Sequence, residues 1–481
     1  MPLRFGTDGV RGVANVELTP EFGLALGRAA AQVLFPSDSK VGPGGTEVSG
    51  TSAGRRCVVV GRDTRRSGSL LQAALSSGFA GEGIDVIDLG VLPTPAVAAV
   101  AQDRGVPGAV ISASHNPFSD NGIKLFGVGG RKLLPAVEAA LEAALDALLE
   151  TPGAHAGHPV GPQVGVLEPD PAALGWYCQQ VVAALEGRRL EGLRVILDAG
   201  NGAAAFTALR IFTAAGAEVV GCIGVEPDGT NINDGCGSTD PRRLAAAVVA
   251  QQADVGLAFD GDADRVIAVD DHGEVVDGDR LLALFATDLA QRDKLAGDTL
   301  VVTVMSNLGL HRAMEAAGIE VHTTGVGDRA VLEALEAHGW SLGGEQSGHL
   351  VFRDLATTGD GVLSGLLLCD LVLRRNVPLG VLAAAAMERL PQVLRNVAVA
   401  DRDGLADTTG GRWAPVWEAV AAEEALLGAA GRVLLRPSGT EPLVRVMVEA
   451  PTHQAAQSAT DRVAAAVEAA LAWPRSDDHC Q

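Results

Sequence analysis

The chain has 481 residues, of which 37 are Lys or Arg and 59 are Asp or Glu, giving a formal net charge of −22 at pH 7. A chain of this length is too long to fold around one compact core. A norm of about 150 residues per domain predicts three or four domains. The negative charge disfavours polyanionic partners, and an aromatic content of 4% leaves few stacking platforms for bases. A small anionic ligand remains compatible with the sequence where Arg and Lys gather locally.

The cysteines, at positions 57, 178, 222, 236, 369 and 480, show neither a CxxC pair nor zinc spacing. Several lie in apolar runs, which fits a reduced cytoplasm. Nothing resembles a secretory signal, and no apolar stretch is long enough to span a bilayer. We therefore expect a cytoplasmic protein that binds a small molecule, and neither nucleic acid nor a membrane.

Short apolar runs alternate with Ala-rich amphipathic stretches along most of the chain. The runs predict strands at 57–60, 86–89, 108–111, 195–197, 219–222, 255–259 and 300–304, and the stretches predict helices at 134–149, 243–252 and 329–338. This alternation indicates βαβ units with parallel sheets. The tail differs, because strands at 433–435 and 443–448 precede one helix near 456–472, which predicts a smaller α+β domain.

Three segments interrupt this pattern. Linkers are expected at 151–168, where Pro, Gly and His cluster, and near 375–390. Residues 36–54 are rich in Gly and Ser, which is typical of a flexible surface insertion, and we assign them no chemistry.

A serine follows the run 108–111 in the segment Ala113-Ser114-His115-Asn116-Pro117. The run is apolar and partly β-branched, so we expect a strand covered on both faces, with Ser114 at the edge where open α/β folds bind ligands. Asn116-Pro117 and Asn121-Gly122 are expected to break regular structure after it. Ser114 is therefore a candidate nucleophile. A simple turn cap is the alternative, while a serine hydrolase is disfavoured because Ser112 and Asn116 stand where a nucleophile elbow has Gly.

Three carboxylates follow the apolar run 255–259, in the loop Asp260-Gly261-Asp262-Ala263-Asp264-Arg265. Carboxylates at alternating positions repel one another unless a cation joins them, and oxygen ligands suit Mg²⁺. The loop predicts a metal site, with a solvated acidic turn as the alternative. A calcium EF-hand is excluded, because Arg265 occupies the position where that loop requires Gly.

These two segments, with Asn121-Gly122-Ile123-Lys124 after the serine, resemble the α-D-phosphohexomutase superfamily, whose members carry a phosphoserine beside a Mg²⁺ held by three Asp. Two later segments agree in the family's order: GEQSGH at 344–349 resembles its sugar-binding loop, and RPSGTEP at 436–442 its phosphate-binding loop. The segments 6–12, 326–329 and 357–361, with Gln346, resemble the branch that acts on amino-sugar phosphates.

The resemblance implies three similar α/β domains with mixed, mostly parallel sheets and a C-terminal α+β domain, around a central cleft. Its implied boundaries are 1–168 with the phosphoserine loop, 169–272 with the metal loop, 273–386 with the sugar-binding loop and 387–481 with the phosphate-binding loop.

Roles follow residue by residue from the resemblance. Asp260, Asp262 and Asp264 would hold Mg²⁺ together with Ser114. Lys124 and Arg265 are candidates for neutralising phosphate charge, with ordinary surface pairing as the alternative. His115 and His349 are candidates for proton transfer, with Arg11 and Lys124 as rivals.

Two loops would bind the substrate. Glu345 and Ser347 are spaced so that both side chains point into a cleft, where a carboxylate accepts two neighbouring sugar hydroxyls. A Gly-rich connector is the alternative. The loop that would cradle the non-reacting phosphate carries hydroxyls, backbone N–H groups and guanidinium groups, from Arg436, Ser438, Gly439, Thr440 and Arg445.

These expectations combine into one reaction, the interconversion of glucosamine 6-phosphate and glucosamine 1-phosphate. It would pass through phosphorylated Ser114 and a 1,6-bisphosphate, towards UDP-N-acetylglucosamine and cell wall. Glucosamine 1,6-bisphosphate or glucose 1,6-bisphosphate would prime the enzyme by phosphorylating Ser114. The sequence leaves open whether the protein forms a homodimer.

Three rivals remain. A phosphomannomutase or phosphoglucomutase would share the scaffold. A haloacid-dehalogenase-like phosphatase shares the apolar strand followed by Asp260-Gly261-Asp262, but expects Thr or Val at position 264. A non-catalytic sugar-phosphate sensor is disfavoured because Ser114 and all three Asp are intact.

Overall fold

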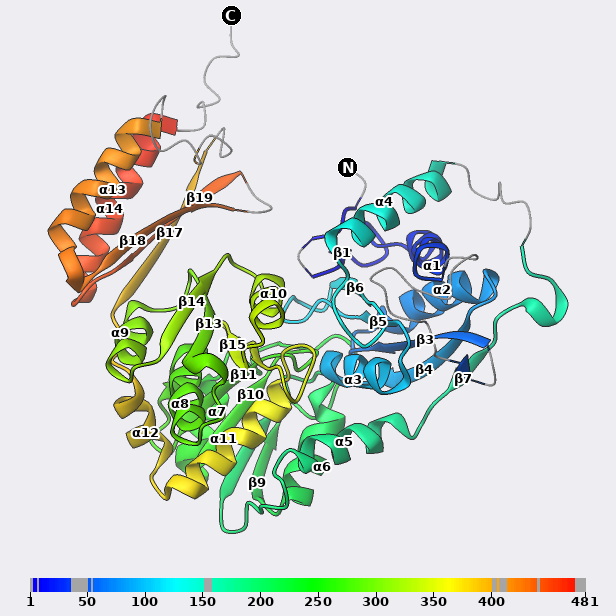
Figure 1. The fold of residues 1–481 in the computed structure, drawn as a ribbon, viewed down its shortest axis with the longest axis horizontal. Coiled ribbons are helices and arrows are strands. Elements are labelled where there is room, and N and C mark those ends of the chain that lie inside the picture. The colour runs from blue at the N-terminus through cyan, green and yellow to red at the C-terminus, as the bar shows by residue number, and fades with distance from the viewer. Residues whose placement is uncertain are drawn as a thin grey trace, which may run out of the picture. The chain divides into compact units, whose positions relative to one another are not determined.

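The computed structural model describes residues 3–6, 8–35, 51–52, 55–150, 158–399, 405, 413–438 and 442–471. The chain divides into two compact units, Met1–Met305 with Gly318–Ala386 and Ser306–Ala317 with Met387–Gln481. The first unit contains three sheets and the second contains one (Figure 1).

The first sheet has the strand order β1-β6-β5-β3-β4-β7, and β2 pairs with β3. β3 runs parallel to β4 and β5, whereas β6 is antiparallel to β5 and β1. The strands are β1 (Val10–Val13), β2 (Thr51–Ser52), β3 (Arg55–Arg62), β4 (Asp85–Val91), β5 (Gly108–Ile111), β6 (Asp120–Phe126) and β7 (Leu167–Pro169), and the helices are α1 (Pro20–Leu34), α2 (Gly68–Gly81), α3 (Thr94–Arg104) and α4 (Pro135–Glu150).

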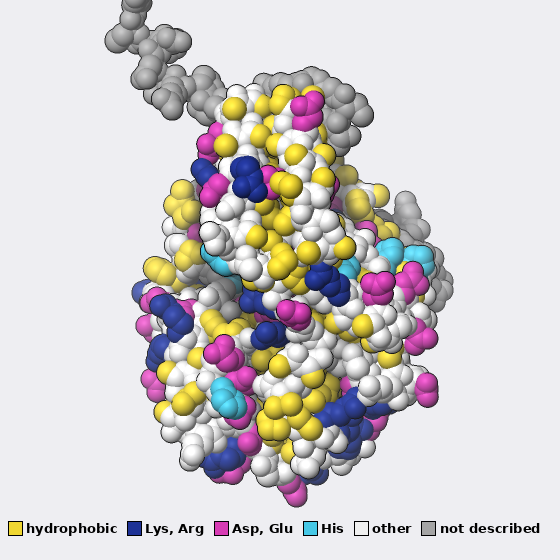
Figure 2. All heavy atoms as spheres, turned by 90° about the vertical axis from the view of Figure 1, so that its left-hand side faces the viewer, with side chains coloured by type: hydrophobic (Ala, Val, Ile, Leu, Met, Phe, Trp, Pro, Cys, Tyr) yellow, Lys and Arg dark blue, Asp and Glu magenta, His cyan; other side chains and the backbone are white. Residues whose placement is uncertain are grey.

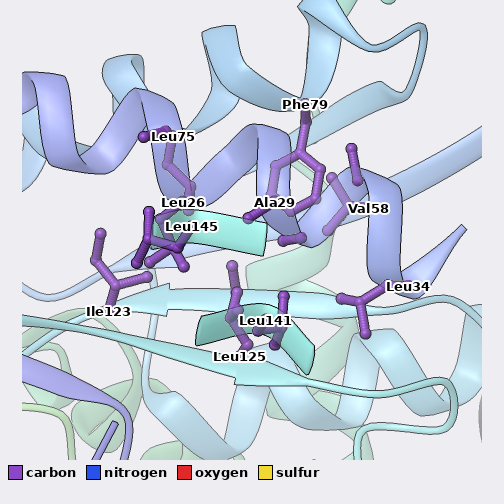
Figure 3. Close-up of a cluster of buried hydrophobic side chains, with 14 of the residues drawn as sticks. Leu26, Ala29, Leu34, Val58, Leu75, Phe79, Ile123, Leu125, Leu141 and Leu145 are labelled. Atoms are coloured by element: carbon purple, nitrogen blue, oxygen red, sulfur yellow. The ribbon is translucent and has the colours of Figure 1, made fainter. Parts of the chain in front are cut away.

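Apolar faces of α1, α2 and α4 pack on this sheet. Leu26, Leu75, Phe79, Leu141 and Leu145 meet strand residues in one buried cluster (Figure 3). α1 begins at Pro20, where the Thr19 side chain accepts from Phe22 N–H and Pro occupies the first turn. The resulting core fixes β5, whose end carries Ser114.

The second sheet has the order β12-β11-β10-β8-β9, with β10 at its centre. β10 is buried along its whole length and runs parallel to β8. It ends at Phe259, so the sheet presents Asp260 and the residues after it at its carboxyl edge. The elements are α5 (Ala173–Ala183), β8 (Arg194–Asp198), α6 (Ala204–Ala215), β9 (Glu218–Ile223), α7 (Arg242–Gln251), β10 (Val255–Phe259), β11 (Val266–Asp270) and β12 (Val275–Val276), after the short helix η1 (Gly161–Gln163).

The third sheet has the order β14-β13-β15-β16. β15 and β16 are antiparallel neighbours, and the loop between them is the expected sugar-binding loop. The elements are α8 (Gly278–Gln291), η2 (Ala296–Asp298), β13 (Thr299–Thr303), β14 (Glu320–Thr324), α10 (Asp328–His338), β15 (Leu342–Gly344), β16 (Leu350–Phe352), α11 (Gly361–Arg375) and α12 (Leu379–Ala386).

The second unit has an antiparallel sheet of order β17-β19-β18, with α13 and α14 side by side in Figure 1. Its buried cluster joins Val444, Val446 and Val448 of β19 to Val463 and Val467 of α14. The elements are α9 (Leu308–Ala316), β17 (Gln392–Ala398), α13 (Ala414–Leu427), η5 (Gly428–Ala430), β18 (Arg432–Pro437), β19 (Leu443–Glu449) and α14 (His453–Leu471).

The α/β fold class expected from the sequence is confirmed, and three local expectations need comment. Asn121 and Gly122 do not break regular structure but lie inside β6, paired with Gly12 and Arg11 of β1. A Cβ at Gly122 would lie 2.5 Å from Ser112 O, so glycine permits the close approach of backbones there. The linker expected near 375–390 contains α12, and most of the 36–54 insertion lies outside the described residues.

Within the described residues, no helix is both long enough and apolar enough to cross a membrane. In the same part of the chain Cys57, Cys178, Cys222, Cys236 and Cys369 form no disulfide. Acidic and basic side chains are interspersed over the face drawn in Figure 2.

Candidate active site

Ser114 lies on a tight turn directly after β5. Its φ is 52°, a left-handed conformation that residues other than Gly rarely adopt. The side chain is buried, and its Oγ donates a hydrogen bond of 2.5 Å to Asp260 Oδ2. The strand-end serine and the acidic loop predicted from separate segments are therefore in direct contact.

Asp260, Asp262 and Asp264 form a buried cluster after β10, with candidate ligand atoms within 4.8 Å of one another. Oδ1 of Asp262 and Oδ1 of Asp264 are buried without a hydrogen-bond partner. Burial, then Asp264 and Asp262, raise the pKa of Asp260 well above its usual range. Unpartnered carboxylate oxygens crowded in this way fit a hard divalent cation.

Thr94 at the start of α3 and Lys124 on β6 orient the middle carboxylate. Asp262 Oδ2 accepts from Thr94 Oγ1 at 2.7 Å and from Lys124 Nζ at 2.8 Å. The Thr94 backbone N–H also donates to Asp262 O. Oδ2 is thus occupied by protein donors, which directs Oδ1 toward the cluster.

Lys124 is buried on β6, although Asn121-Gly122 just before it were expected to break regular structure. Its Nζ lies 2.8 Å from Asp8 Oδ2 and 3.5 Å from Asp264 Oδ2. Burial lowers the pKa of Lys124, but Asp262, Asp8 and Asp264 raise it well above its usual range. This lysine is a fixed positive charge beside the metal loop.

Asp8 joins Lys124 to two further cations, Arg11 and Lys132. Its carboxylate lies 2.7 Å from Arg11 Nη2 and 2.9 Å from Lys132 Nζ. Burial raises the pKa of Asp8, yet Lys124, Lys132 and Arg11 lower it well below its usual range. Arg11 also donates to Asn116 Oδ1 at 3.4 Å, so it lies next to the Ser114 loop.

Two histidines lie near the cluster in different states. His115 Nδ1 is 3.5 Å from Ser114 Oγ, and burial, then Arg265 and Arg11, lower its pKa to about 4. His349 is buried, and although burial lowers its pKa, Asp264, Asp328 and Glu345 raise it to about 9.

The backbone N–H of Gly359 donates to His349 Nε2 at 3.2 Å. This hydrogen bond requires a lone pair on Nε2, so it opposes the rise in the pKa of His349. We assign the His349 proton to Nδ1, which lies 3.7 Å from Asp264 Oδ2.

Arg265 ends the metal loop and is half-buried. Its backbone N–H donates to Asp260 Oδ1 at 3.2 Å, and its Nε lies 3.8 Å from Asp264 Oδ1. That Nε is buried without a hydrogen-bond partner, so the guanidinium retains donor capacity at the site.

The loop between β15 and β16 is held by its own polar groups. Glu345 Oε1 accepts from Gly327 N–H at 3.1 Å, and Oε2 accepts from Ser347 Oγ at 3.2 Å. Gly348 has a φ of 89°, and a Cβ there would lie 2.1 Å from Val266 O. Glycine thus lets this loop pack against the strand that follows the metal loop, on the same unit as Ser114.

The expected phosphate-binding residues belong to the second unit. Arg436 on β18 and Arg445 on β19 are directly opposite in the antiparallel register, and Ser438 follows β18. Gly439 and Thr440 lie outside the described residues.

Sequence reasoning missed several polar residues at this site, namely Asp8, Asp63, Arg65, Thr94 and Asn233. Asp63 and Arg65 follow β3 at the same sheet edge as Ser114, so polar residues directly after that apolar run were an available signal. Asn233 lies on a loop after β9 and offered no such signal.

This combination of sheets and loops defines a phosphohexomutase-type architecture. The chain belongs to the phosphoglucomutase/phosphomannomutase family, because models of its α/β/α domains I, II and III and of its C-terminal domain match residues 2–151, 176–273, 277–390 and 394–466. The resemblance noted in the sequence is thereby confirmed.

A phosphoglucosamine mutase of Frankia alni is 54% identical over 99% of this chain and 100% of its own length. A solved phosphoglucomutase/phosphomannomutase family protein of Burkholderia thailandensis is 26% identical, covers 97% of this chain and 99% of its own, and has a TM-score of 0.75. An N-acetylphosphoglucosamine mutase of Aspergillus fumigatus, solved with GlcNAc-6P and magnesium, shares the fold at a TM-score of 0.65 and 19% identity, covering 98% of this chain and 96% of its own.

Proposed function

We propose that this chain is an enzyme with phosphoglucosamine mutase activity, interconverting glucosamine 6-phosphate and glucosamine 1-phosphate. The observation that carries this proposal is the contact between Ser114 Oγ and Asp260 inside a buried cluster of three carboxylates. The full-length likeness to a phosphoglucosamine mutase selects the amino sugar among the substrates of the family.

The reaction consists of two phosphoryl transfers through Ser114. In the first, the O1 hydroxyl of glucosamine 6-phosphate gives its proton to a base and attacks the phosphorus on Ser114. The Oγ–P bond breaks, and Ser114 Oγ takes up a proton. The product is glucosamine 1,6-bisphosphate. After the sugar reverses its orientation, Ser114 Oγ gives its proton to a base and attacks the phosphorus on O6. The O6–P bond breaks and O6 takes up a proton, which yields glucosamine 1-phosphate and regenerates phosphorylated Ser114.

Asp260, Asp262 and Asp264, with Ser114, would hold Mg²⁺. The bound ion would supply positive charge to the transferring phosphoryl oxygens. The magnesium named in the Aspergillus structure supports this assignment at the level of the family. Lys124 and Arg265 add fixed positive charge from either side of the loop.

Proton transfer falls to histidines by position. His115 Nδ1 is next to Ser114 Oγ, and His349, the last residue of the sugar-binding loop, lies beside Asp264. Glu345 and Ser347 would bind sugar hydroxyls, and Arg436, Ser438, Gly439, Thr440 and Arg445 would hold the non-reacting phosphate. A substrate held by this phosphate anchor in either of two orientations would bring O1 or O6 to the same serine.

We further propose four domains with the boundaries that the family resemblance implies. We also propose a cytoplasmic location for the protein and a 1,6-bisphosphate as the primer that first phosphorylates Ser114. A homodimer is the assembly we would test first.

A coupled assay comparing glucosamine, glucose and mannose phosphates tests the substrate. We expect the highest kcat/KM for glucosamine 6-phosphate. A higher kcat/KM for mannose or glucose phosphate would instead assign phosphomannomutase or phosphoglucomutase activity on the same scaffold. Release of inorganic phosphate without isomerisation would assign a phosphatase.

A further inference from the structure

Two backbone carbonyls on the Ser114 turn accept hydrogen bonds from the same two side chains. Arg65 Nη2 donates to Ser114 O at 3.1 Å and to Asn116 O at 2.5 Å. Asn233 Nδ2 donates to the same two oxygens, at 3.0 Å and 3.3 Å. We call Arg65 and Asn233 the Ser114 clamp.

The Arg65 half of the clamp is buried beneath the turn. Its guanidinium pairs with Asp63, which also accepts from Ser112 Oγ at 2.7 Å. Ser112 Oγ in turn accepts from the Ser114 N–H at 2.9 Å. Side chains therefore satisfy both the N–H and the carbonyl of Ser114, in a place where water has no access.

The Asn233 half arrives from the sheet that carries the metal loop. Its own N–H donates to Gly200 O at 2.8 Å, and Ser238 N–H of the same loop donates to Phe259 O at 3.0 Å. Phe259 is the last residue of β10 and precedes Asp260. Asn233 thus ties the Ser114 turn to the strand end that presents the metal ligands.

The backbone conformation of Ser114 and the geometry of phosphoryl transfer both require that the Ser114 turn be held in place. The left-handed backbone of Ser114 is strained for a residue with a side chain and persists only where its surroundings fix it. Phosphoryl transfer demands in-line placement of the serine oxygen, and small misplacements of a reacting atom cost large factors in rate.

We infer that Arg65 and Asn233 are positioning residues for phosphoryl transfer, because they fix Ser114 Oγ relative to the metal loop. They act through the backbone of Ser114 and need no contact with the substrate. This inference rests on the proposed function and adds two residues to it.

Asn233→Ala tests the inference, with Asn231→Ala as the matched control. Asn231 lies on the same loop, and its side chain bonds only within that loop, to Asp228 N–H and Glu226 O. We would measure kcat, KM, the magnesium dependence of turnover, the thermal midpoint, and the single-turnover rate at which glucose 1,6-bisphosphate phosphorylates Ser114, by intact mass.

For Asn233→Ala we expect kcat and the Ser114 phosphorylation rate to fall roughly 10- to 100-fold, with KM within about twofold of the wild-type value. Asn231→Ala should stay within about twofold in every rate. Arg65→Lys keeps the charge opposite Asp63 but loses the planar fork, so it should lower kcat in the same way.

Wild-type phosphorylation rates in folded Asn233→Ala would overturn the inference, as would an equal loss in Asn231→Ala. A fall in thermal midpoint with unchanged kcat per folded molecule would show a merely structural role and would also overturn it. If the wild-type chain takes no phosphoryl group on Ser114, the proposed function fails as well, which separates the two cases.

Discussion

Asp262 is the residue whose substitution tests the metal assignment most directly. Its Oδ2 is taken by Thr94 and Lys124, while its buried Oδ1 has no partner. Replacement by Asn keeps the shape and removes the charge, so Asp262→Asn should weaken Mg²⁺ binding and lower turnover by at least ~100-fold.

Titration calorimetry with Mg²⁺ and a coupled assay check this. Asp103→Asn, at an exposed position near the carboxyl end of α3, is the control. Near wild-type turnover of Asp262→Asn at low Mg²⁺ would contradict the assignment.

Glu345 tests the sugar-binding loop. Its two oxygens are engaged by Gly327 N–H and Ser347 Oγ, which orients the carboxylate for further acceptor contacts. Glu345→Gln should cost roughly 2–4 kcal/mol in kcat/KM for glucosamine 6-phosphate and leave Mg²⁺ affinity unchanged, because hydrogen bonds to a charged acceptor are lost.

Glu333→Gln, on the exposed side of α10, serves as the control for that substitution. An equal loss of Mg²⁺ affinity in Glu345→Gln would mean that the loop belongs to the metal site instead.

At the scale of elements, the amino end of α3 reaches across to the metal loop. Thr94 bonds Asp262 through both its hydroxyl and its backbone N–H. Thr94→Val keeps the side-chain shape and the backbone bond, so it should raise the Mg²⁺ concentration for half-maximal activity by roughly 10-fold, and Thr94→Ser should restore it. An unchanged Mg²⁺ dependence in Thr94→Val would refute this orienting role.

The elements also show why some features were predictable. The run 255–259 predicts β10 with its observed bounds, since a fully buried strand is a continuous apolar run. The prediction that Asn121-Gly122 breaks regular structure was wrong, because the pairing of β6 with β1 and β5 overrides local turn propensity.

The contact between Ser114 and Asp260 followed from two strand ends and a family resemblance. The place of Arg65 after β3 was an available signal, but its contact with Ser114 and that of Asn233 could not be predicted, because the two residues lie 49 and 119 residues from Ser114 along the chain. Contacts of this kind are set by tertiary packing.

At the scale of the molecule, Asp360 and Tyr177 join the second and third sheets' segments inside the first unit. Tyr177 donates to both carboxylate oxygens of Asp360, which also caps α11 by accepting from Leu363 N–H. Burial raises the pKa of Asp360 to about 6 despite the lowering effect of these bonds.

A raised carboxyl pKa means that the folded state binds the proton more tightly than the unfolded state, so this group favours folding below about pH 4 and loses that contribution as the pH rises through 6. Asp360→Asn keeps a cap and never ionises. Its stability relative to the wild type should therefore improve by roughly 2–3 kcal/mol between pH 4 and pH 7, at about 1.36 kcal/mol per pKa unit. Urea unfolding at several pH values measures this, and a difference independent of pH would contradict it.

The central claim is that Ser114, and not Asp260, carries the phosphoryl group. The chain is incubated with glucose 1,6-bisphosphate, treated with or without hydroxylamine, and mapped by peptide mass spectrometry. A serine phosphate ester resists hydroxylamine, whereas an aspartyl phosphate is cleaved because its carbonyl is activated. We predict a hydroxylamine-stable label on Ser114 and loss of both label and turnover in Ser114→Ala. A hydroxylamine-labile label on the 255–265 peptide, or undiminished label and turnover in Ser114→Ala, would contradict the account.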